Sequence, residues 1–238
     1  MTESREASGR SVFVGLTGGS GHAYAERLIV ELARLSCDVS LSITSAGAKV
    51  LRHELGVEAG ASGELLPAAL ESWLGADVAA RVTAFPAEAV EAPPSSGTSL
   101  TGGVVLCPCS MGTLARVAVG FSSNLVERAA DVALKERRNL VLVPRETPLS
   151  EVHLENMLRL ARMGATILPA MPGFYHRPRD LDDLVGHVVG KILDRLGLAH
   201  DVGARWRGLP DEPADPAGFE PPPPIDPTGP GGAGGGSR

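Results

Sequence analysis

The sequence predicts a three-layer α/β fold, in which helices cover both faces of a doubly wound parallel sheet. Two observations support this prediction. Short apolar runs alternate with segments of helical periodicity along most of the chain. The runs at residues 103–107 and 140–144 are apolar throughout, as expected for strands that are buried on both faces. Alternating strands and helices connect by right-handed crossovers, so we expect one flavodoxin-like or Rossmann-like domain.

The expected elements begin with a strand at residues 12–17 and a helix at about 21–35. In that helix Tyr24, Leu28 and Leu32 recur on one face. Further strands are expected at 39–44, 81–85, 103–107, 140–144 and 165–168, and further helices at 46–55, 63–74, 124–138, 151–163 and 181–196. Residues 57–80 are ambiguous apart from the short helix. Residues 86–102 have few side chains that could pack, and we expect a loop over the carboxyl edge of the sheet.

The chain has 238 residues and 43% hydrophobic composition, enough for one substantial core. Residues 1–10 are polar and are expected to be disordered. More than half of the positions from Pro210 onward are proline or glycine, which predicts a disordered tail at residues 208–238. The folded domain is therefore expected at residues 11–207.

The composition argues against several classes of function. A net charge of -6 does not suit a general binder of nucleic acid or anionic membranes. The first apolar run is too short to span a bilayer and does not resemble a signal peptide. Three cysteines, Cys37, Cys107 and Cys109, fit a reducing cytoplasm, and their spacing with the six histidines forms no metal site.

Four polar turns, at residues 17–21, 44–47, 107–113 and 144–148, follow expected strands. In an open parallel sheet, ligands bind where the carboxyl ends of the strands meet the next helices. These turns carry hydroxyls, backbone amides, an arginine and a glutamate, which predicts a phosphorylated ligand. The first turn should leave N–H groups free at a helix N-terminus. It lacks the Walker A and dinucleotide patterns, so a mononucleotide is favoured.

Several candidate side chains also have ordinary structural explanations. Ser110 suits a helix N-cap as well as a phosphate contact. Arg128 and Lys135 are two helical turns apart, which is also typical of a solvated flank with acidic neighbours. However, Arg145 and Glu146 directly follow a buried strand, where charge is rarely needed for packing, and they favour an anion clamp.

Tyr175 and Lys191 receive no role from pattern alone. Tyr175 lies in the two-proline segment 172–178, where a tyrosine commonly fills a hydrophobic gap and pairs its hydroxyl. Lys191 lies on the last expected helix and is a surface lysine by default.

The runs 128–138, 144–148, 153–158 and 172–178 carry a resemblance to a known family. From Val12 to about Trp206 the chain resembles the UbiX-type flavin prenyltransferases, within the flavin-dependent cysteine-decarboxylase-like superfamily. The resemblance implies an enzyme that moves a dimethylallyl group from dimethylallyl monophosphate to reduced FMN, where a new ring bridges N5 and C6. It further implies delivery of the product to a UbiD-type decarboxylase. In relatives the site lies between subunits of a homododecamer, where Trp206 would reach a neighbouring site.

The resemblance also assigns roles to individual residues. The residues implied to bind FMN are Gly18, Gly19, Ser20, Thr44, Ser110, Met111, Gly112, Thr113 and Arg145. Those implied to bind the prenyl phosphate are Tyr175, Lys191, Arg128 and Lys135, with Glu54 and Glu146 completing the pocket. We expect Glu146 to exchange a proton with the phosphate and Ser20 to help remove the C6 proton. The chain has no aspartate cluster to hold Mg²⁺, and none is required by a monophosphate leaving group held by side chains.

Three positions depart from the family pattern. Gly19 replaces a common alanine, Lys191 replaces an arginine and so loses its bidentate fork, and Val90 replaces a tryptophan that some relatives carry. Two alternative functions stay open. One is an FMN-dependent decarboxylase of a cysteine-derived substrate, although residues 108–113 replace the motif expected there. The other is a non-catalytic protein that binds or delivers flavin.

Overall fold

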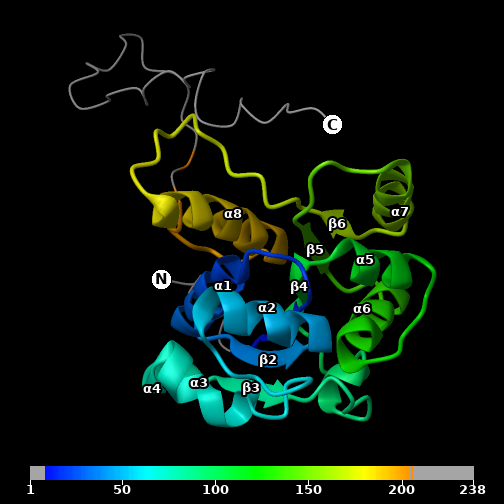
Figure 1. The fold of residues 1–238 in the computed structure, drawn as a ribbon, viewed down its shortest axis with the longest axis horizontal. Coiled ribbons are helices and arrows are strands. Elements are labelled where there is room, and N and C mark those ends of the chain that lie inside the picture. Colours follow the sequence, from blue (N-terminus) through cyan, green and yellow to red (C-terminus); the bar gives the residue numbers. More distant parts are fainter. Residues whose placement is uncertain (1–8, 204, 206–238) are drawn as a thin grey trace, which may run out of the picture. The chain divides into compact units, whose positions relative to one another are not determined.

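A computed structural model describes residues 9–203 and 205 of the chain. It contains a parallel six-stranded sheet in the order β3-β2-β1-β4-β5-β6 (Figure 1). The strands are β1 (Ser11–Leu16), β2 (Asp38–Ile43), β3 (Val82–Phe85), β4 (Gly103–Cys109), β5 (Leu140–Pro144) and β6 (Thr166–Ile167). The strand order reverses between β1 and β4, which are neighbours, so the doubly wound prediction is confirmed.

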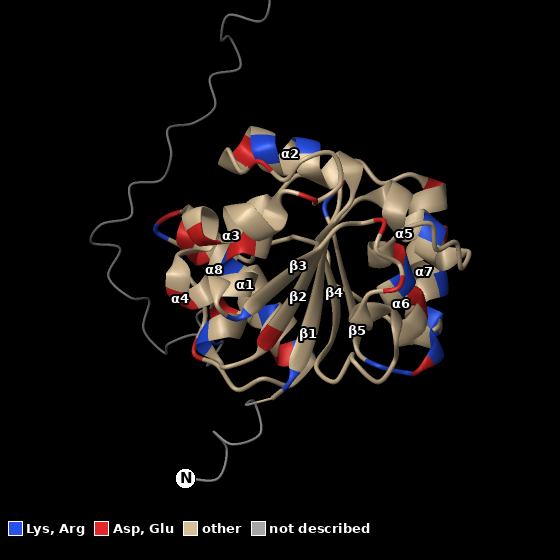
Figure 2. Ribbon diagram, turned by 90° about the horizontal axis from the view of Figure 1, so that it is seen from below, with Lys and Arg blue, Asp and Glu red and all other residues tan. Residues whose placement is uncertain are grey.

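Helices cover both faces of this sheet (Figure 2). One face carries α1 (His22–Arg34), α3 (Leu66–Leu74), α4 (Ala76–Ala79) and α8 (Leu181–Leu196). The other carries α5 (Met111–Ala118), α6 (Leu125–Lys135) and α7 (Glu151–Arg162). The helix α2 (Ser45–Leu55) packs against α1 and lies above the carboxyl ends of the strands. None of the helices among residues 9–203 and 205 is long and apolar enough to cross a membrane.

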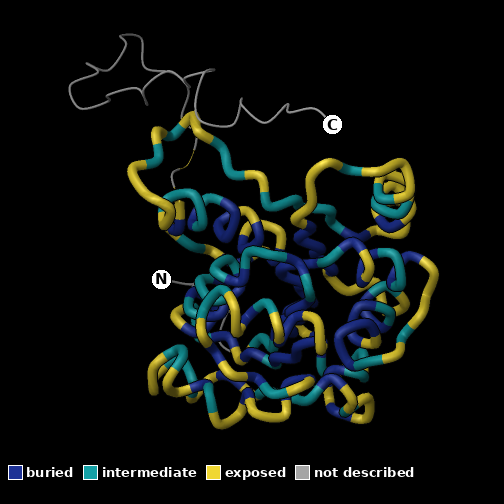
Figure 3. The backbone as a smooth tube through the Cα atoms, viewed as in Figure 1, coloured by how far each residue is buried: buried dark blue, intermediate teal, exposed yellow. Residues whose placement is uncertain are grey.

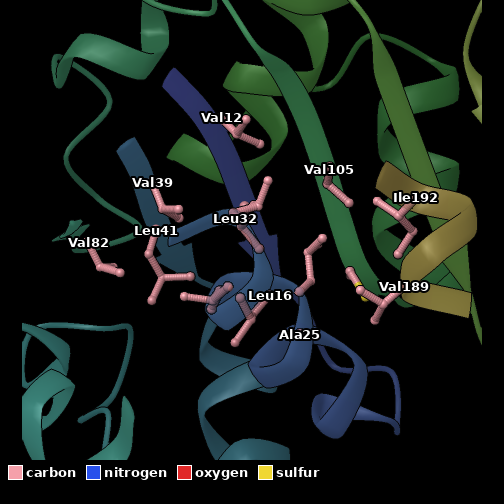
Figure 4. Close-up of a cluster of buried hydrophobic side chains, with 14 of the residues drawn as sticks. Val12, Leu16, Ala25, Leu32, Val39, Leu41, Val82, Val105, Val189 and Ile192 are labelled. Atoms are coloured by element: carbon pink, nitrogen blue, oxygen red, sulfur yellow. The ribbon is translucent and has the colours of Figure 1, made fainter. Parts of the chain in front are cut away.

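The core is divided by the sheet into two clusters, because side chains alternate between the faces of each strand. In β1, Val12 and Leu16 join the cluster under α1 and α8 (Figure 4), whereas Phe13 joins the cluster under α5 and α6. The central strands β1, β4 and β5 are almost wholly buried, while α7 and the loop before α8 are largely exposed (Figure 3).

The observed elements differ from the expected ones mainly at their ends. Strand β4 continues to Cys109, past a register shift that begins after Leu106. The short helix α4 was not expected. All three cysteines are buried and free. Burial raises the pKa of the Cys109 thiol to about 12, which fits an inert packed thiol.

The prediction that residues 86–102 cover the carboxyl edge is wrong. This loop leaves β3 at that edge and runs along α6: the Leu125 N–H donates to the Ala87 carbonyl at 2.7 Å, and Gly97 contacts Glu136. The loop ends at the amino edge, where the Gly102 N–H donates to Ser11. The connection must run the length of the sheet because β3 ends at one edge and β4 begins at the other. The two predicted disordered termini fall almost wholly outside the described residues.

Candidate functional site

The first and third turns are joined by Thr17, a fully buried residue that follows β1. Its N–H and its Oγ1 both donate to the Pro108 carbonyl, at 3.2 and 2.8 Å. Its Oγ1 also accepts the Ser110 N–H at 2.6 Å. Thr17 therefore fixes the turn after β1 against the turn after β4, at the point where the strand order reverses.

The second turn packs closely on the first. The Thr44 N–H donates to the Leu16 carbonyl at 3.0 Å, and Thr44 Oγ1 caps α2 by accepting the Gly47 N–H at 3.1 Å. A Cβ at Gly18 would lie 2.8 Å from the Ala46 methyl group, closer than real Cβ atoms come. Only glycine at position 18 permits this approach, which leaves the turn's backbone uncovered by a side chain.

The third turn opens α5 with a hydroxyl pair. Ser110 Oγ caps the helix by accepting the Thr113 N–H at 3.3 Å, and it lies 3.1 Å from Thr113 Oγ1. The ordinary N-cap role is thus present. Met111 is buried beneath the turn, whereas Gly112 is exposed on the same first turn of the helix.

The fourth turn reaches the first through Arg145. Its Nε donates to the Ser20 carbonyl at 3.4 Å, and its side chain is exposed. Glu146 Oε1 accepts the Thr147 N–H at 3.1 Å. Both charged residues line a cavity of about 250 Å³ at the carboxyl ends of β5 and β6, together with Leu149, Met157 and residues 169–171. The four turns therefore meet, as predicted from the sequence.

The N-terminus of α1 departs from the expectation, because its N–H groups already have an anionic partner. The Glu54 carboxylate accepts from the Gly21 N–H at 3.0 Å and from the His22 N–H at 2.8 Å. Partial burial favours the neutral acid, but hydrogen bonds from Ser20, His22 and Gly21 outweigh it and lower the pKa of Glu54. The helix dipole does attract an anion here, but that anion belongs to the protein.

His22 is a site residue that the sequence analysis missed. It is fully buried at the start of α1, and its Nδ1 lies 3.4 Å from Glu54 Oε2. Burial lowers the pKa of His22, opposed by the Glu54 charge. Thr17 was likewise noted only as part of its turn. The available signal was position, since both residues flank the glycines of a strand-to-helix turn.

In the described part of the chain, Arg128 and Lys135 pair with acidic neighbours rather than with the four turns. Both are exposed on α6, where Arg128 lies 3.4 Å from Asp131 and Lys135 lies 2.6 Å from Glu136. Lys135 lines a larger cavity of about 710 Å³ with Asn139 and Gly164, which precede β5 and β6. Glu146 follows β5. The first and last residues of this five-residue strand are roughly 13 Å apart, so Lys135 and Glu146 of one chain face opposite edges.

Tyr175 lies in the loop before α8, and Lys191 lies in the second half of α8. The loop that carries Tyr175 is tied to the end of β5, because the Ala170 N–H donates to the Pro144 carbonyl at 2.9 Å. The Tyr175 hydroxyl lies 3.1 Å from Nε2 of His187, one turn before the exposed Lys191 on α8. His187 was not identified from the sequence. Val90 is exposed in the loop along α6, and Trp206 lies outside the described residues.

Comparison with known proteins gives consistent matches. Residues 1–193 match a family model described as Flavoprotein. The flavin prenyltransferase UbiX of Halalkalibacterium halodurans is 47% identical over 193 residues, covering 81% of this chain and 91% of the relative. A crystal structure of AnUbiX in complex with FMN and dimethylallyl pyrophosphate superposes with a TM-score of 0.74 and 36% identity, over 84% of this chain and 99% of that one. A dodecameric FMN-dependent UbiX-like decarboxylase from Escherichia coli O157:H7 gives 0.72 and 40%, over 83% and 100%.

Proposed function

The chain belongs to the flavoprotein family, among the UbiX-type flavin prenyltransferases, and from this we propose that it transfers a dimethylallyl group from dimethylallyl monophosphate to reduced FMN. The observation that carries the proposal is the convergence of the four turns. Thr17 joins the first turn to the third, and Arg145 joins the fourth to the first. Such a junction supplies backbone amides, hydroxyls and a cation for one phosphorylated flavin.

The residues at this junction fit FMN. The residues that we propose to hold it are Gly18, Gly19, Ser20, Thr44, Ser110, Met111, Gly112, Thr113 and Arg145. Gly18 and Gly19 lie within close packing distance of Ala46 and Pro108, so an approaching ring would meet backbone rather than side chains. Reduced FMN supplies the nucleophilic atoms of the reaction.

Transfer would break the allylic C–O bond of the donor and form a bond to N5 in place of its proton. Ring closure would then join C6 to the alkene, which takes up one proton while C6 releases one. Negative charge develops on the departing phosphate, and fixed cations stabilise it without reorganisation. We assign this role to Lys191, with Tyr175 as a hydrogen-bond donor. We propose that Glu146, which lines the same cavity as Arg145, exchanges a proton with the phosphate. Because side chains stabilise the charge on the phosphate in this proposal, the reaction requires no metal ion.

We propose that Arg128 and Lys135 act in the site of a neighbouring copy. Both are exposed, and within one chain Lys135 faces the opposite edge of the sheet from Glu146. A related protein is dodecameric, which supports an assembly in which α6 of one chain meets the carboxyl edge of another. The proposed site is complete only in this assembly.

Ser20 and Glu54 form a second catalytic pair in this proposal. The hydrogen bond from Ser20 helps keep Glu54 ionised, so this carboxylate is placed to take up the Ser20 hydroxyl proton. We propose that Ser20 passes the C6 proton toward Glu54 during ring closure. The product would then serve a UbiD-type decarboxylase in the cytoplasm, a compartment compatible with three free, buried thiols.

The test is to incubate the full-length protein with reduced FMN and dimethylallyl monophosphate, and to measure the mass of the flavin. We expect flavin heavier by one isoprene unit, and a loss of about 10²–10⁴ in rate for Glu146→Gln, since a positioned acid or base contributes that much. Unchanged flavin would reject the proposal. It would leave the decarboxylase and flavin-delivery alternatives, which release of carbon dioxide from a cysteine-derived substrate would separate.

A further inference from the structure

The loop that carries Tyr175 is held on α8 by one side chain, His187. The Gly173 N–H donates to His187 Nδ1 at 3.2 Å, and the Tyr175 hydroxyl lies 3.1 Å from His187 Nε2. Both ring nitrogens of this partly buried histidine are therefore used by the same loop.

Ring packing reinforces the hydrogen bonds. The Tyr175 ring meets His187 edge-on, with centroids 5.6 Å apart, and the His176 ring stacks on His187 at 5.1 Å with an interplanar angle of 11°. Gly173 permits this approach, because a Cβ there would lie 2.8 Å from Tyr175 Cε1. The loop conformation and the imidazole position thus determine each other.

The hydrogen bonds also define which nitrogen of His187 carries the proton. Nδ1 accepts from a backbone N–H and so has no proton of its own. The neutral ring is therefore protonated at Nε2, which donates to the Tyr175 oxygen. Because the Tyr175 oxygen accepts this hydrogen bond, its own hydroxyl proton points away from His187 and is donated to a different acceptor. His187 in this tautomer sets the direction in which Tyr175 donates.

Charged neighbours oppose protonation of this histidine. Burial, the stacked His176 and Lys191, in that order, lower the pKa of His187. Lys191 is one helical turn after His187, and Asp183 is one turn before it. Asp183 is engaged by Arg179, whose N–H and Nε donate to it at 2.9 and 3.2 Å. A second proton on His187 would point from Nδ1 at the Gly173 N–H, which would replace a hydrogen bond by a repulsion.

We propose that His187 is a positioning residue of the prenyl-phosphate pocket, which orients Tyr175 to donate to the phosphate beside Lys191. The proposal rests on the proposed function for the identity of the phosphate ligand. It assigns a role to a residue that neither the family motifs nor the turn pattern identified. It also predicts that acidification weakens phosphate binding through His187.

The experiment measures binding of dimethylallyl monophosphate to the full-length protein loaded with oxidised FMN, so that no transfer occurs. Calorimetric Kd values are compared for the wild type, His187→Phe, Tyr175→Phe and the double variant, between about pH 5 and 8. His53→Phe, which removes an exposed histidine from α2, is the matched control. We expect His187→Phe to weaken binding roughly fivefold at neutral pH, the usual effect of one net hydrogen bond.

The double variant and the pH profile separate positioning from general structural damage. In the Tyr175→Phe background, His187→Phe should cause no further loss. The ordinary pKa of a histidine side chain is 6.5. Below this pH the Kd of the wild type should rise more steeply than the Kd of His187→Phe. Titration of the ligand itself affects both proteins alike. Equal Kd values for wild type and His187→Phe, or an equal loss in the Tyr175→Phe background, would overturn the proposal.

Two further results keep the test decisive. If His187→Phe does not fold, His187→Asn replaces it, because its carbonyl can still accept from Gly173 while its amide is too short for Tyr175. It should keep the melting temperature and lose affinity, and unchanged affinity would contradict the role.

Binding that depends on His187 without prenylation of reduced FMN would reject the proposed function alone. Prenylation with binding that ignores His187 would reject this inference alone, and no binding by wild type would reject both.

Discussion

Replacing Thr17 by valine removes the hydroxyl that joins two of the site's turns, while it preserves the shape of the side chain. In the wild type this hydroxyl donates to Pro108 at 2.8 Å and accepts from Ser110 at 2.6 Å. The Pro108 carbonyl keeps a second donor, the Thr17 N–H at 3.2 Å. The Ser110 N–H loses the acceptor that Thr17 provides, so the main cost is one unsatisfied donor in a partly buried place.

That cost is about 1–3 kcal/mol in the free energy of unfolding. For a domain of this size each kcal/mol shifts the melting temperature by about 2–4 °C, so Thr17→Val should melt about 2–12 °C lower. The third turn would also lose its fixed position against the first. We therefore expect the Kd for FMN to rise roughly fivefold or more, which fluorescence titration measures.

Two matched variants test this reasoning. Thr17→Ser keeps the hydroxyl and should retain most of the FMN affinity. Ser42→Ala removes another fully buried hydroxyl, on β2, whose Oγ has no hydrogen-bond partner among the described residues. It should be nearly neutral or stabilising. If Thr17→Val behaved like Ser42→Ala in both melting and FMN binding, Thr17 would not join the turns as we describe.

Three further predictions follow from charged groups. Glu54→Gln should weaken the start of α1. The fold lowers the pKa of Glu54 from 4.5, so the ionised carboxylate stabilises the protein fully above pH 4.5. This stabilisation is lost as the pH falls through the lower pKa of the folded state. Thermal melts across acidic pH should therefore show a smaller pH dependence for the variant. Glu127→Ala should cost about 1–3 kcal/mol in chemical denaturation, because the hydrogen bonds to Arg116 and Ser123 are lost while both donors can still reach water. Arg145→Gln should weaken FMN binding with little change in melting temperature, since Arg145 is exposed; an unaltered Kd would remove it from the flavin site.

The sequence was sufficient for the order of the strands and of the longer helices, because buried strands and amphipathic helices have distinct periods. The limits of β5 and α8 agree with prediction at both ends. The convergence of the four turns also followed from topology, since parallel strands place their carboxyl ends at one edge. Misplacement of residues 86–102 has a physical cause: few of its residues are apolar, yet Ala92, Pro94 and Leu100 are buried and hold the loop along the sheet.

Side-chain pairings across the fold were not predictable from local pattern. Glu54 reaches the N-terminus of α1 from another helix, and only the packing of α2 against α1 brings them together. Similarly, nothing in the helical pattern of α8 indicates that His187 meets a loop residue twelve positions earlier. Lys135 illustrates a different limit of prediction from sequence, because a family resemblance does not show where a residue lies in the fold. The family resemblance implies a role for this residue, but within one chain it lies at the amino edge of the sheet, and we therefore propose that its role depends on assembly.

A crystal structure of the assembled protein with FMN and dimethylallyl monophosphate tests the central claim most directly. We predict the isoalloxazine against residues 18–20 and 110–113 with Arg145 beside it, and the donor phosphate between Lys191, Tyr175 and the Arg128 and Lys135 of an adjacent copy. A flavin bound away from these turns would contradict the account. So would a donor phosphate distant from every one of these cations.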